Sequence, residues 1–175
     1  AHYAAIIEID ASQLEPMVAA PGDPGNGVAI SRLNERINVD LVFVGSCTGA
    51  KRDDFDMYAK VARQAVAAGR RVPPSVAAFA QFGSIDVEAY CIEQGYDKLL
   101  QEAGFQVLAP GCGACINAGP GVSSSPDQVT ISSINRNFPG RSGPGKVYLA
   151  SPLTCMASAI AGSITAYRSD KDNWV

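Results

Sequence analysis

The chain has 175 residues, of which 47% are hydrophobic and 18% are charged, and its formal net charge is -3. This length allows one domain with a real core, because a chain of this size buries roughly 70% of the surface that its unfolded form exposes. The mildly acidic charge gives no electrostatic reason to expect nucleic acid or an anionic membrane as a partner.

The first residues have neither the basic segment nor the long apolar segment of a secretory signal, and they begin without Met. We therefore expect a piece of a longer polypeptide that works in the cytoplasm. Residues 147–167 carry no charge, but Pro152, Gly162 and several Ser and Thr side chains interrupt them. This composition predicts a buried strand, a turn and a core helix, and no membrane partner.

The first part of the chain predicts a lead-in followed by a strand and a helix. A short apolar strand is expected at residues 5–9, and a Pro/Gly-rich loop follows at residues 21–27. Residues 41–44 are a continuous apolar run, which is typical of a strand buried on both faces. A helix is expected from Asp53, because a carboxylate suits the first turn and apolar side chains then recur at helical spacing.

The second part of the chain continues this alternation. The remaining strands are expected at residues 72–82, 105–108, 129–132 and 147–150, and the remaining helices at residues 85–94, 96–103 and 152–162. Strands that alternate with helices predict an α/β fold, here a three-layer α/β/α domain with a mostly parallel sheet. We expect one domain overall, with a lead-in at residues 1–38, the α/β domain at residues 39–168 and a polar tail at residues 169–175.

Three polar loops follow predicted strands directly. They contain Cys47, the pair Cys112 and Cys115, and the run at residues 135–141. In open α/β sheets, ligands bind beyond the carboxyl ends of the strands. We therefore expect the three loops to meet at this edge of the sheet and to form the site there.

Five cysteines are an odd number, and their spacing is not that of a disulfide framework. Cys91 and Cys155 lie inside predicted helices, where we expect small buried apolar side chains. Cys47, Cys112 and Cys115 lie in glycine-rich loops, which this interpretation fits poorly. A thioredoxin-like redox pair would leave Cys47 unexplained, and a structural zinc ion takes four ligands where we find three.

Three thiolates without a fourth ligand have another meaning. A [4Fe–4S] cluster normally takes four thiolates. With three, one iron keeps an open coordination position, and that iron can polarise a substrate oxygen as a Lewis acid. The three loop cysteines therefore favour a catalytic iron–sulfur cluster over one that only transfers electrons.

Three runs of residues resemble the signature segments of the aconitase-type hydro-lyases, a family that includes aconitase, homoaconitase and the large subunit of 3-isopropylmalate dehydratase. The runs are Gly45-Ser46-Cys47-Thr48, Gly111-Cys112-Gly113-Ala114-Cys115 and Asn135-Arg136-Asn137-Phe138-Pro139-Gly140-Arg141. They occur in the order of the family and at similar spacing, and the resemblance covers nearly the whole chain. It implies the third, cluster-bearing domain of such an enzyme.

The resemblance also implies a set of site residues. Three thiolates would hold a [4Fe–4S] cluster with one open iron: Cys47, Cys112 and Cys115. Three further side chains would bind a di- or tricarboxylate substrate: Arg136, Arg141 and Asn135. The arginines suit this role, because a guanidinium fork binds a carboxylate through two parallel hydrogen bonds.

The chain departs from the family pattern in two respects. Many members continue the first motif as Thr-Asn, where this chain has Thr48-Gly49, which leaves the subfamily open. Family catalysis also requires a base and histidine partners, and His2 is the only histidine here. The resemblance implies that the base lies on another domain or on a small swivelling subunit, so we expect this chain to be inactive alone. The alternative is a non-catalytic iron–sulfur or metal-binding sensor or interaction domain.

Overall fold

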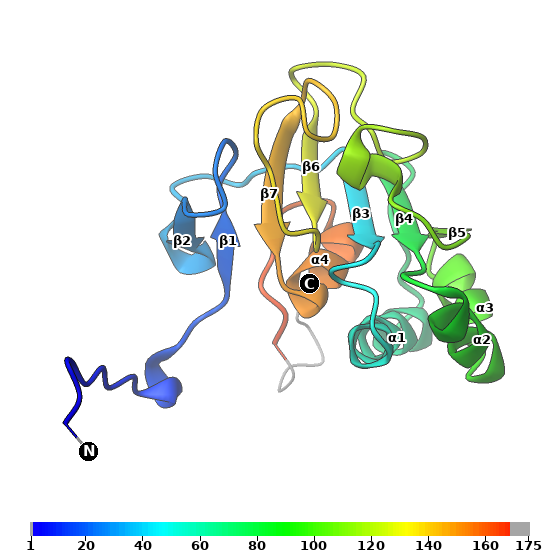
Figure 1. Ribbon diagram of the computed structural model, residues 1–175. Coiled ribbons are helices and arrows are strands. Elements are labelled where there is room, and N and C mark those ends of the chain that lie inside the picture. The colour runs from blue at the N-terminus through cyan, green and yellow to red at the C-terminus, as the bar shows by residue number, and fades with distance from the viewer. Residues whose placement is uncertain (1, 169–175) are drawn as a thin grey trace.

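The structure is a computed structural model that describes residues 2–168. Seven strands form one sheet in the order β2-β1-β7-β6-β3-β4-β5 (Figure 1). The strands are β1 (Met17–Ala19), β2 (Gly27–Ala29), β3 (Leu41–Gly45), β4 (Ala77–Gln81), β5 (Gln106–Leu108), β6 (Val129–Ser132) and β7 (Lys146–Ala150). The helices are α1 (Arg52–Ala67), α2 (Ile85–Glu93), α3 (Tyr96–Glu102), α4 (Pro152–Ala161) and the short 3-10 helices η1 (Ala11–Gln13), η2 (Ile30–Arg32) and η3 (Gly113–Ile116).

The sheet is mostly parallel, as the sequence predicts. Strands β3 to β7 pair in parallel, whereas β1 pairs antiparallel with both β2 and β7. The carboxyl ends of β3, β4, β5, β6 and β7 therefore lie at the same edge. All five residues of the central strand β3 are buried, which explains its uninterrupted apolar sequence.

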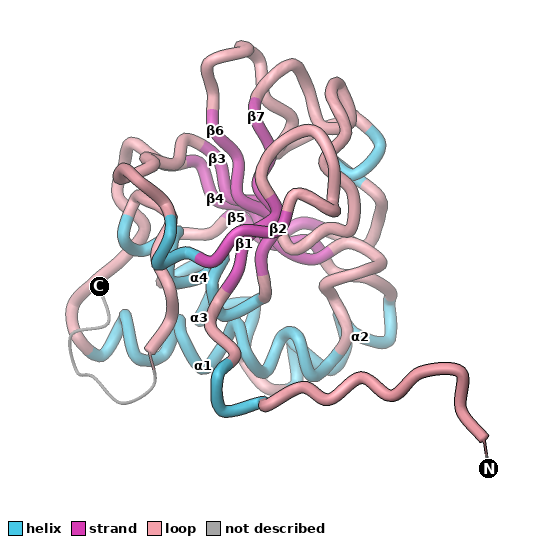
Figure 2. Tube along the Cα trace, turned by 90° about the vertical axis from the view of Figure 1, so that its left-hand side faces the viewer, coloured by secondary structure: helices cyan, strands magenta, loops and turns pink. Residues whose placement is uncertain are grey.

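The two faces of the sheet are covered differently. The main core joins one face of β3, β4 and β6 to all four α-helices, which are grouped on one side of the strands in Figure 2. A smaller core on the other face joins Phe43 of β3 to Ala114 and Cys115 of η3 and to Ile134. The α/β fold is confirmed, and the layer on the second face consists of η3 and loops rather than α-helices.

Helix α1 begins and packs as the sequence indicates. Asp53 and Asp54 lie in its first turn, and the Asp54 carboxylate accepts a hydrogen bond from the backbone N–H of Lys51. Its apolar side chains form a continuous buried face that includes Phe55 and Tyr58. Because α1 starts seven residues after β3 ends, the Cys47 loop is held between two buried elements.

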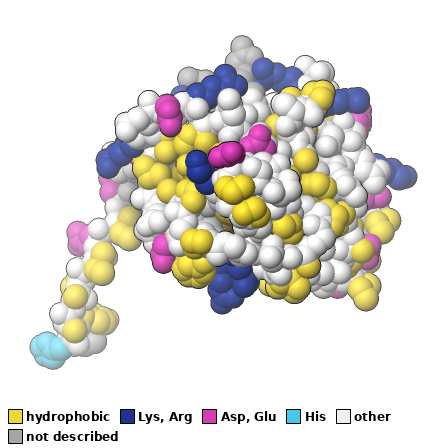
Figure 3. All heavy atoms as spheres, turned by 90° about the horizontal axis from the view of Figure 1, so that it is seen from above, with side chains coloured by type: hydrophobic (Ala, Val, Ile, Leu, Met, Phe, Trp, Pro, Cys, Tyr) yellow, Lys and Arg dark blue, Asp and Glu magenta, His cyan; other side chains and the backbone are white. Residues whose placement is uncertain are grey.

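The lead-in differs from the sequence-based expectation. Residues 5–9 form no strand; they belong to an exposed segment that projects from the body and carries His2 near its end (Figures 1 and 3). The strands are instead β1 and β2, a hairpin on either side of the expected Pro/Gly-rich loop. An apolar run becomes a strand only where a partner supplies hydrogen bonds, and β7 supplies them to β1.

Two other expectations concern the extent of single segments. The strand expected at residues 72–82 begins only at Ala77, because Pro73 and Pro74 have no N–H to donate to a ladder. The expected polar tail at residues 169–175 lies outside the described residues. Within residues 2–168, no helix is both long and apolar enough to cross a membrane.

Candidate functional site

The Cys47 loop begins with two residues in the left-handed region. Gly45 has φ +107° and Ser46 has φ +58°. A Cβ atom on Gly45 would lie 2.0 Å from the carbonyl oxygen of Gln81, so this turn requires glycine. Ser46 is fully buried despite its unusual backbone conformation, whereas Cys47 is exposed. The strained turn thus directs the thiol of Cys47 to the surface at the end of β3.

Ser46 joins the first cysteine loop to the second. Its hydroxyl lies 3.4 Å from the carbonyl oxygens of both Gly111 and Cys112. These residues are 65 and 66 positions away in the sequence, so only the parallel arrangement of β3, β4 and β5 brings them together. No sequence pattern predicted this role for Ser46, although the residue lies inside the first signature run.

The cysteine pair lies at the start of a short helix. Cys112 is the N-cap of η3 and is exposed. Cys115 lies within η3, donates its backbone N–H to the Cys112 carbonyl oxygen over 3.0 Å, and is buried against Phe43. Two of the three thiols therefore face the surface and the third lies beneath them.

Arg141 contacts the buried thiol directly. Its Nη2 lies 3.6 Å from the Cys115 Sγ, within hydrogen-bonding range for sulfur, while its Nε is buried and has no hydrogen-bond partner in the described part of the chain. The expected loop at residues 135–141 therefore reaches the cysteine loop. Asn135 and Arg136 are exposed, and neither makes a hydrogen bond or ion pair with the described part of the chain.

Ser133 ties the end of β6 to the end of β3. Its Oγ accepts the backbone N–H of Gly45 over 3.0 Å and lies 2.8 Å from the Tyr58 hydroxyl, which donates to the carbonyl oxygen of Gly49 over 2.6 Å. Since the Tyr58 proton is committed to Gly49, the Ser133 hydroxyl donates to Tyr58. Burial raises the pKa of Tyr58 well above its ordinary value, which keeps this network protonated.

Asn137 anchors the loop that carries the arginines. Its Nδ2 donates to the backbone carbonyl oxygens of Ala20 over 2.7 Å and of Val147 over 3.1 Å. The backbone carbonyl oxygen of Asn137 accepts the N–H of Gly22. The side chain is 2% exposed. The loop is therefore fixed to the hairpin and to β7. The feature of the sequence that points to this anchor is the polar Asn137 in the middle of the third signature run.

Cys91 and Cys155 are excluded from the site by their positions. Both are fully buried in the main core, in α2 and α4, as the sequence indicates. Burial raises the pKa of the Cys91 thiol to about 12, with the carboxylates of Asp56 and Asp97 adding to the shift, and burial also raises the pKa of the Cys155 thiol. These two thiols stay protonated. The candidate ligands are therefore the three cysteines of the loops, Cys47, Cys112 and Cys115.

The donor set in the three loops contains the thiols that an iron–sulfur cluster takes as ligands. Among residues 2–168, no three Cys, His, Asp or Glu side chains are grouped closely enough to ligate one metal ion. A four-iron cluster is a larger body than one ion, and its thiolate ligands stand farther apart. Thiolates are the ligands that such clusters take, and three occur here in loops that touch through Ser46 and Arg141.

A hollow of about 400 Å3 opens beside Cys47. Its lining includes Lys51, Arg52, Ser84 and Asp86, and Arg52 is paired with Asp86 over 2.8 Å. Lys51 makes no ion pair with any of the described residues, and a lysine without such a partner suits an anionic ligand.

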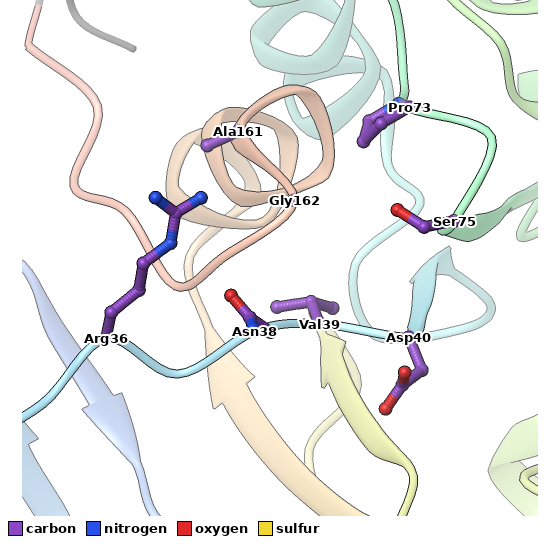
Figure 4. Close-up of a pocket in the computed structure, with 8 residues that line it drawn as sticks. All are labelled: Arg36, Asn38, Val39, Asp40, Pro73, Ser75, Ala161 and Gly162. Carbon is purple, nitrogen blue, oxygen red and sulfur yellow. The ribbon is translucent and has the colours of Figure 1, made fainter.

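A second hollow, of about 440 Å3, lies at the amino-terminal edge of the parallel strands (Figure 4). Its lining includes Arg36, Asp40, Ser75 and Gly162, and none of the cysteines. It is separated from the candidate site by the length of the sheet.

Comparison with known proteins gives a consistent result. The model of the aconitase family (aconitate hydratase) matches residues 1–162. The 3-isopropylmalate dehydratase large subunit of Aliarcobacter butzleri is 39% identical over 97% of this chain and 39% of its own length. That of Mycolicibacterium smegmatis is 38% identical over 100% of this chain and 40% of its own length, and the chloroplastic subunit of Arabidopsis thaliana is 40% identical over 94% and 34%.

The chain thus spans about two fifths of the length of these curated relatives. The matched region contains all three signature runs and every candidate site residue. The fold, the loops at the carboxyl ends of the strands and the match over nearly the whole sequence agree, and the chain belongs to the aconitase family.

Proposed function

We propose that this chain is the cluster-bearing part of a hydro-lyase that dehydrates and rehydrates a hydroxy di- or tricarboxylic acid. The observation that carries the proposal is the contact between the two cysteine loops through Ser46, together with the contact of Arg141 with Cys115. Both contacts join segments that are far apart in the sequence and that the family resemblance had assigned to one site.

In this proposal, Cys47, Cys112 and Cys115 hold a [4Fe–4S] cluster. When bound through three thiolates, such a cluster supplies an iron with an open position that acts as a Lewis acid. The turn at Gly45 and Ser46 aims Cys47 outward, and η3 carries the other two thiols. Cys115 is buried, so we expect η3 to shift when all three thiolates are ligands.

The remaining site residues bind and orient the substrate. Arg141 places a partly buried guanidinium beside Cys115, and the exposed Arg136 makes no hydrogen bond within residues 2–168, so its donors can bind a carboxylate. Asn135 lies next to them in the loop that Asn137 anchors. The uncompensated charge of Lys51 adds to the attraction for an acidic substrate.

Other parts of the reaction come from outside these residues. The curated relatives are named large subunits, and the chain spans about two fifths of their length. We propose that a base and its acid–base partners lie on further domains or on a small swivelling subunit, and that the enzyme works in the reducing cytoplasm, where free thiols persist.

Cluster binding is tested by anaerobic reconstitution of the chain with iron and sulfide. The expected result is brown protein with about four iron atoms per chain and broad visible absorbance. Cys112→Ser should lose most of this absorbance, whereas Cys91→Ala, a matched change of a cysteine in the helix core, should keep it. Folded wild-type protein that stays colourless would contradict the proposal.

Substrate binding is tested by the electron paramagnetic resonance signal of the reduced, reconstituted chain. A hydroxy dicarboxylate should change the signal, and Arg141→Gln should raise the concentration needed by roughly tenfold, because a charge-assisted hydrogen-bond pair is lost. Arg32→Gln, in η2, is the control. A signal that no hydroxy acid changes would favour the alternative, a non-catalytic iron–sulfur sensor or interaction domain.

A further inference from the structure

Gln81 lies between the two cysteine loops. It is the last residue of β4 and stands opposite Gly45 at the end of β3 and Leu108 at the end of β5. The Cys47 loop continues directly from Gly45, and the loop that carries Cys112 continues from Leu108. Gln81 is therefore the strand-end residue that adjoins both loops.

Gln81 holds one loop through its backbone and the other through its side chain. Its carbonyl oxygen accepts the N–H of Ser46 over 3.0 Å. Its Nε2 donates to the carbonyl oxygen of Ala109 over 3.1 Å. The distance between the two loops is thus set by the length and hydrogen bonding of one residue.

The glycines of both loops pack directly against Gln81. A Cβ atom on Gly113 would lie 2.2 Å from the Gln81 Oε1, and one on Gly111 would lie 3.1 Å from its Nε2. The amide group therefore fills the space beneath the turn that carries Cys112 and Cys115. Its shape and its hydrogen bonds both determine where that turn can lie.

One atom of this amide is left without a partner. Gln81 is 7% exposed, and its Oε1 is buried and accepts no hydrogen bond from any residue in the range 2–168. A buried carbonyl oxygen without a donor destabilises the conformation that leaves it so. Oε1 lies directly beneath Gly113, so it faces the backbone of the turn that carries Cys112 and Cys115.

We propose that Gln81 is a positioning residue for the three-cysteine site: it couples the two cysteine loops, and its Oε1 accepts a backbone N–H of the 112–115 turn when the three thiolates bind their cluster. The inference rests on the proposed function. It accounts for the buried Oε1, which has no partner within residues 2–168 and lies beneath Gly113, in the short helix η3 that also carries Cys115.

The test uses Gln81→Met in the full 175-residue chain, because methionine keeps the length of the side chain and removes both hydrogen-bonding groups. Gln106→Met, a change of the exposed first residue of β5, is the matched control. After anaerobic reconstitution, Gln81→Met should lose iron to a chelator roughly fivefold faster than wild type, the effect of one lost hydrogen bond. Residues 109–118 of its cluster-free form should exchange amide hydrogens faster, while the midpoint of thermal unfolding stays close to that of Gln106→Met.

The outcomes separate the two proposals. Wild-type protein that binds a cluster, with Gln81→Met losing iron at the wild-type rate, overturns the inference and leaves the proposed function standing. Wild-type protein that binds no cluster overturns both. If Gln81→Met fails to fold, Gln81→Glu, which keeps an oxygen at the Oε1 position and loses the donor to Ala109, should show the faster exchange of residues 109–118; wild-type exchange there overturns the inference.

Discussion

At the scale of residues, the site depends on polar side chains that contact backbone groups far away in the sequence. Ser46 joins the two cysteine loops, whereas Ser133 and Asn137 join loops at the carboxyl edge of the sheet to β3 and β7. All three are buried. Buried polar groups of this kind specify one conformation, because removing one leaves its partners without hydrogen bonds.

Asn137 offers the clearest test at this scale. Asn137→Ala leaves the carbonyl oxygens of Ala20 and Val147 without their donor, so we expect the free energy of unfolding to fall by roughly 2–3 kcal/mol. Urea denaturation followed by circular dichroism measures this change. Asn135→Ala, two residues earlier and exposed, should change it by less than about 0.5 kcal/mol. Equal effects of the two substitutions would disprove the anchor role.

At the scale of elements, the carboxyl ends of β3 and β4 are packed too closely for a side chain. Gly45 lies against the backbone of Gln81, and Gly49 and Gly83 pack in the same way against Ser133 and Ala50. These glycines let the Cys47 loop lie flat on the ends of the neighbouring strands. The loop is thereby held in place even though its thiol faces the surface.

The substitution Gly45→Ala tests this close packing. Its Cβ would lie 2.0 Å from the Gln81 carbonyl oxygen, so β3 and β4 must separate, and we expect a loss of stability of about 3 kcal/mol or more. Gly69→Ala is the control, because Gly69 also has a positive φ but has open space around it. It should cost only about 1 kcal/mol. Similar unfolding midpoints in urea for the two variants would contradict the packing argument.

At the scale of the whole molecule, the two faces of the sheet have different roles. The face covered by α1 to α4 holds the larger core and supplies stability. The other face has a smaller core around Phe43 and is covered by η3 and loops, which carry the candidate site. The buried thiols of the helix layer provide a way to probe the first face without touching the second.

Stability should fall at alkaline pH. The Cys91 thiol keeps its proton up to a pKa of about 12 in the folded chain, whereas in the unfolded chain it releases the proton near 9.0. Between these values the unfolded chain binds fewer protons, so the free energy of unfolding decreases as pH rises, by about 1.4 kcal/mol per pH unit for this group. Cys155 and Tyr58, whose pKa values are also raised by burial, act in the same direction.

Urea denaturation of the reduced protein between pH 9 and pH 11 measures this slope. In Cys91→Ala, the free energy of unfolding should fall less steeply with pH, by about 1.4 kcal/mol per pH unit. The slope should stay negative because the other buried groups still contribute to it. A slope that is the same in wild type and in Cys91→Ala would show that the folded state does not hold this proton.

Local sequence was sufficient for the main elements and for the loops that carry the site. A continuous apolar run marked β3, carboxylates in the first turn marked α1, and glycine-rich runs after strands marked Cys47, Cys112 and Cys115. The family resemblance added the arginine loop. These features are readable because periodicity, capping and strand endings depend on neighbours in the sequence.

Only the tertiary structure decided how these parts are joined. The lead-in strands lie at Met17–Ala19 and Gly27–Ala29, because β7 offers a partner there, whereas no strand among residues 2–168 pairs with residues 5–9. The roles of Gln81 and Asn137 come from hydrogen bonds to residues 28 and more than 100 positions away. Sequence determined which residues reach the carboxyl edge of the sheet, and packing determined which of them hold each other, because such contacts arise only when distant segments meet.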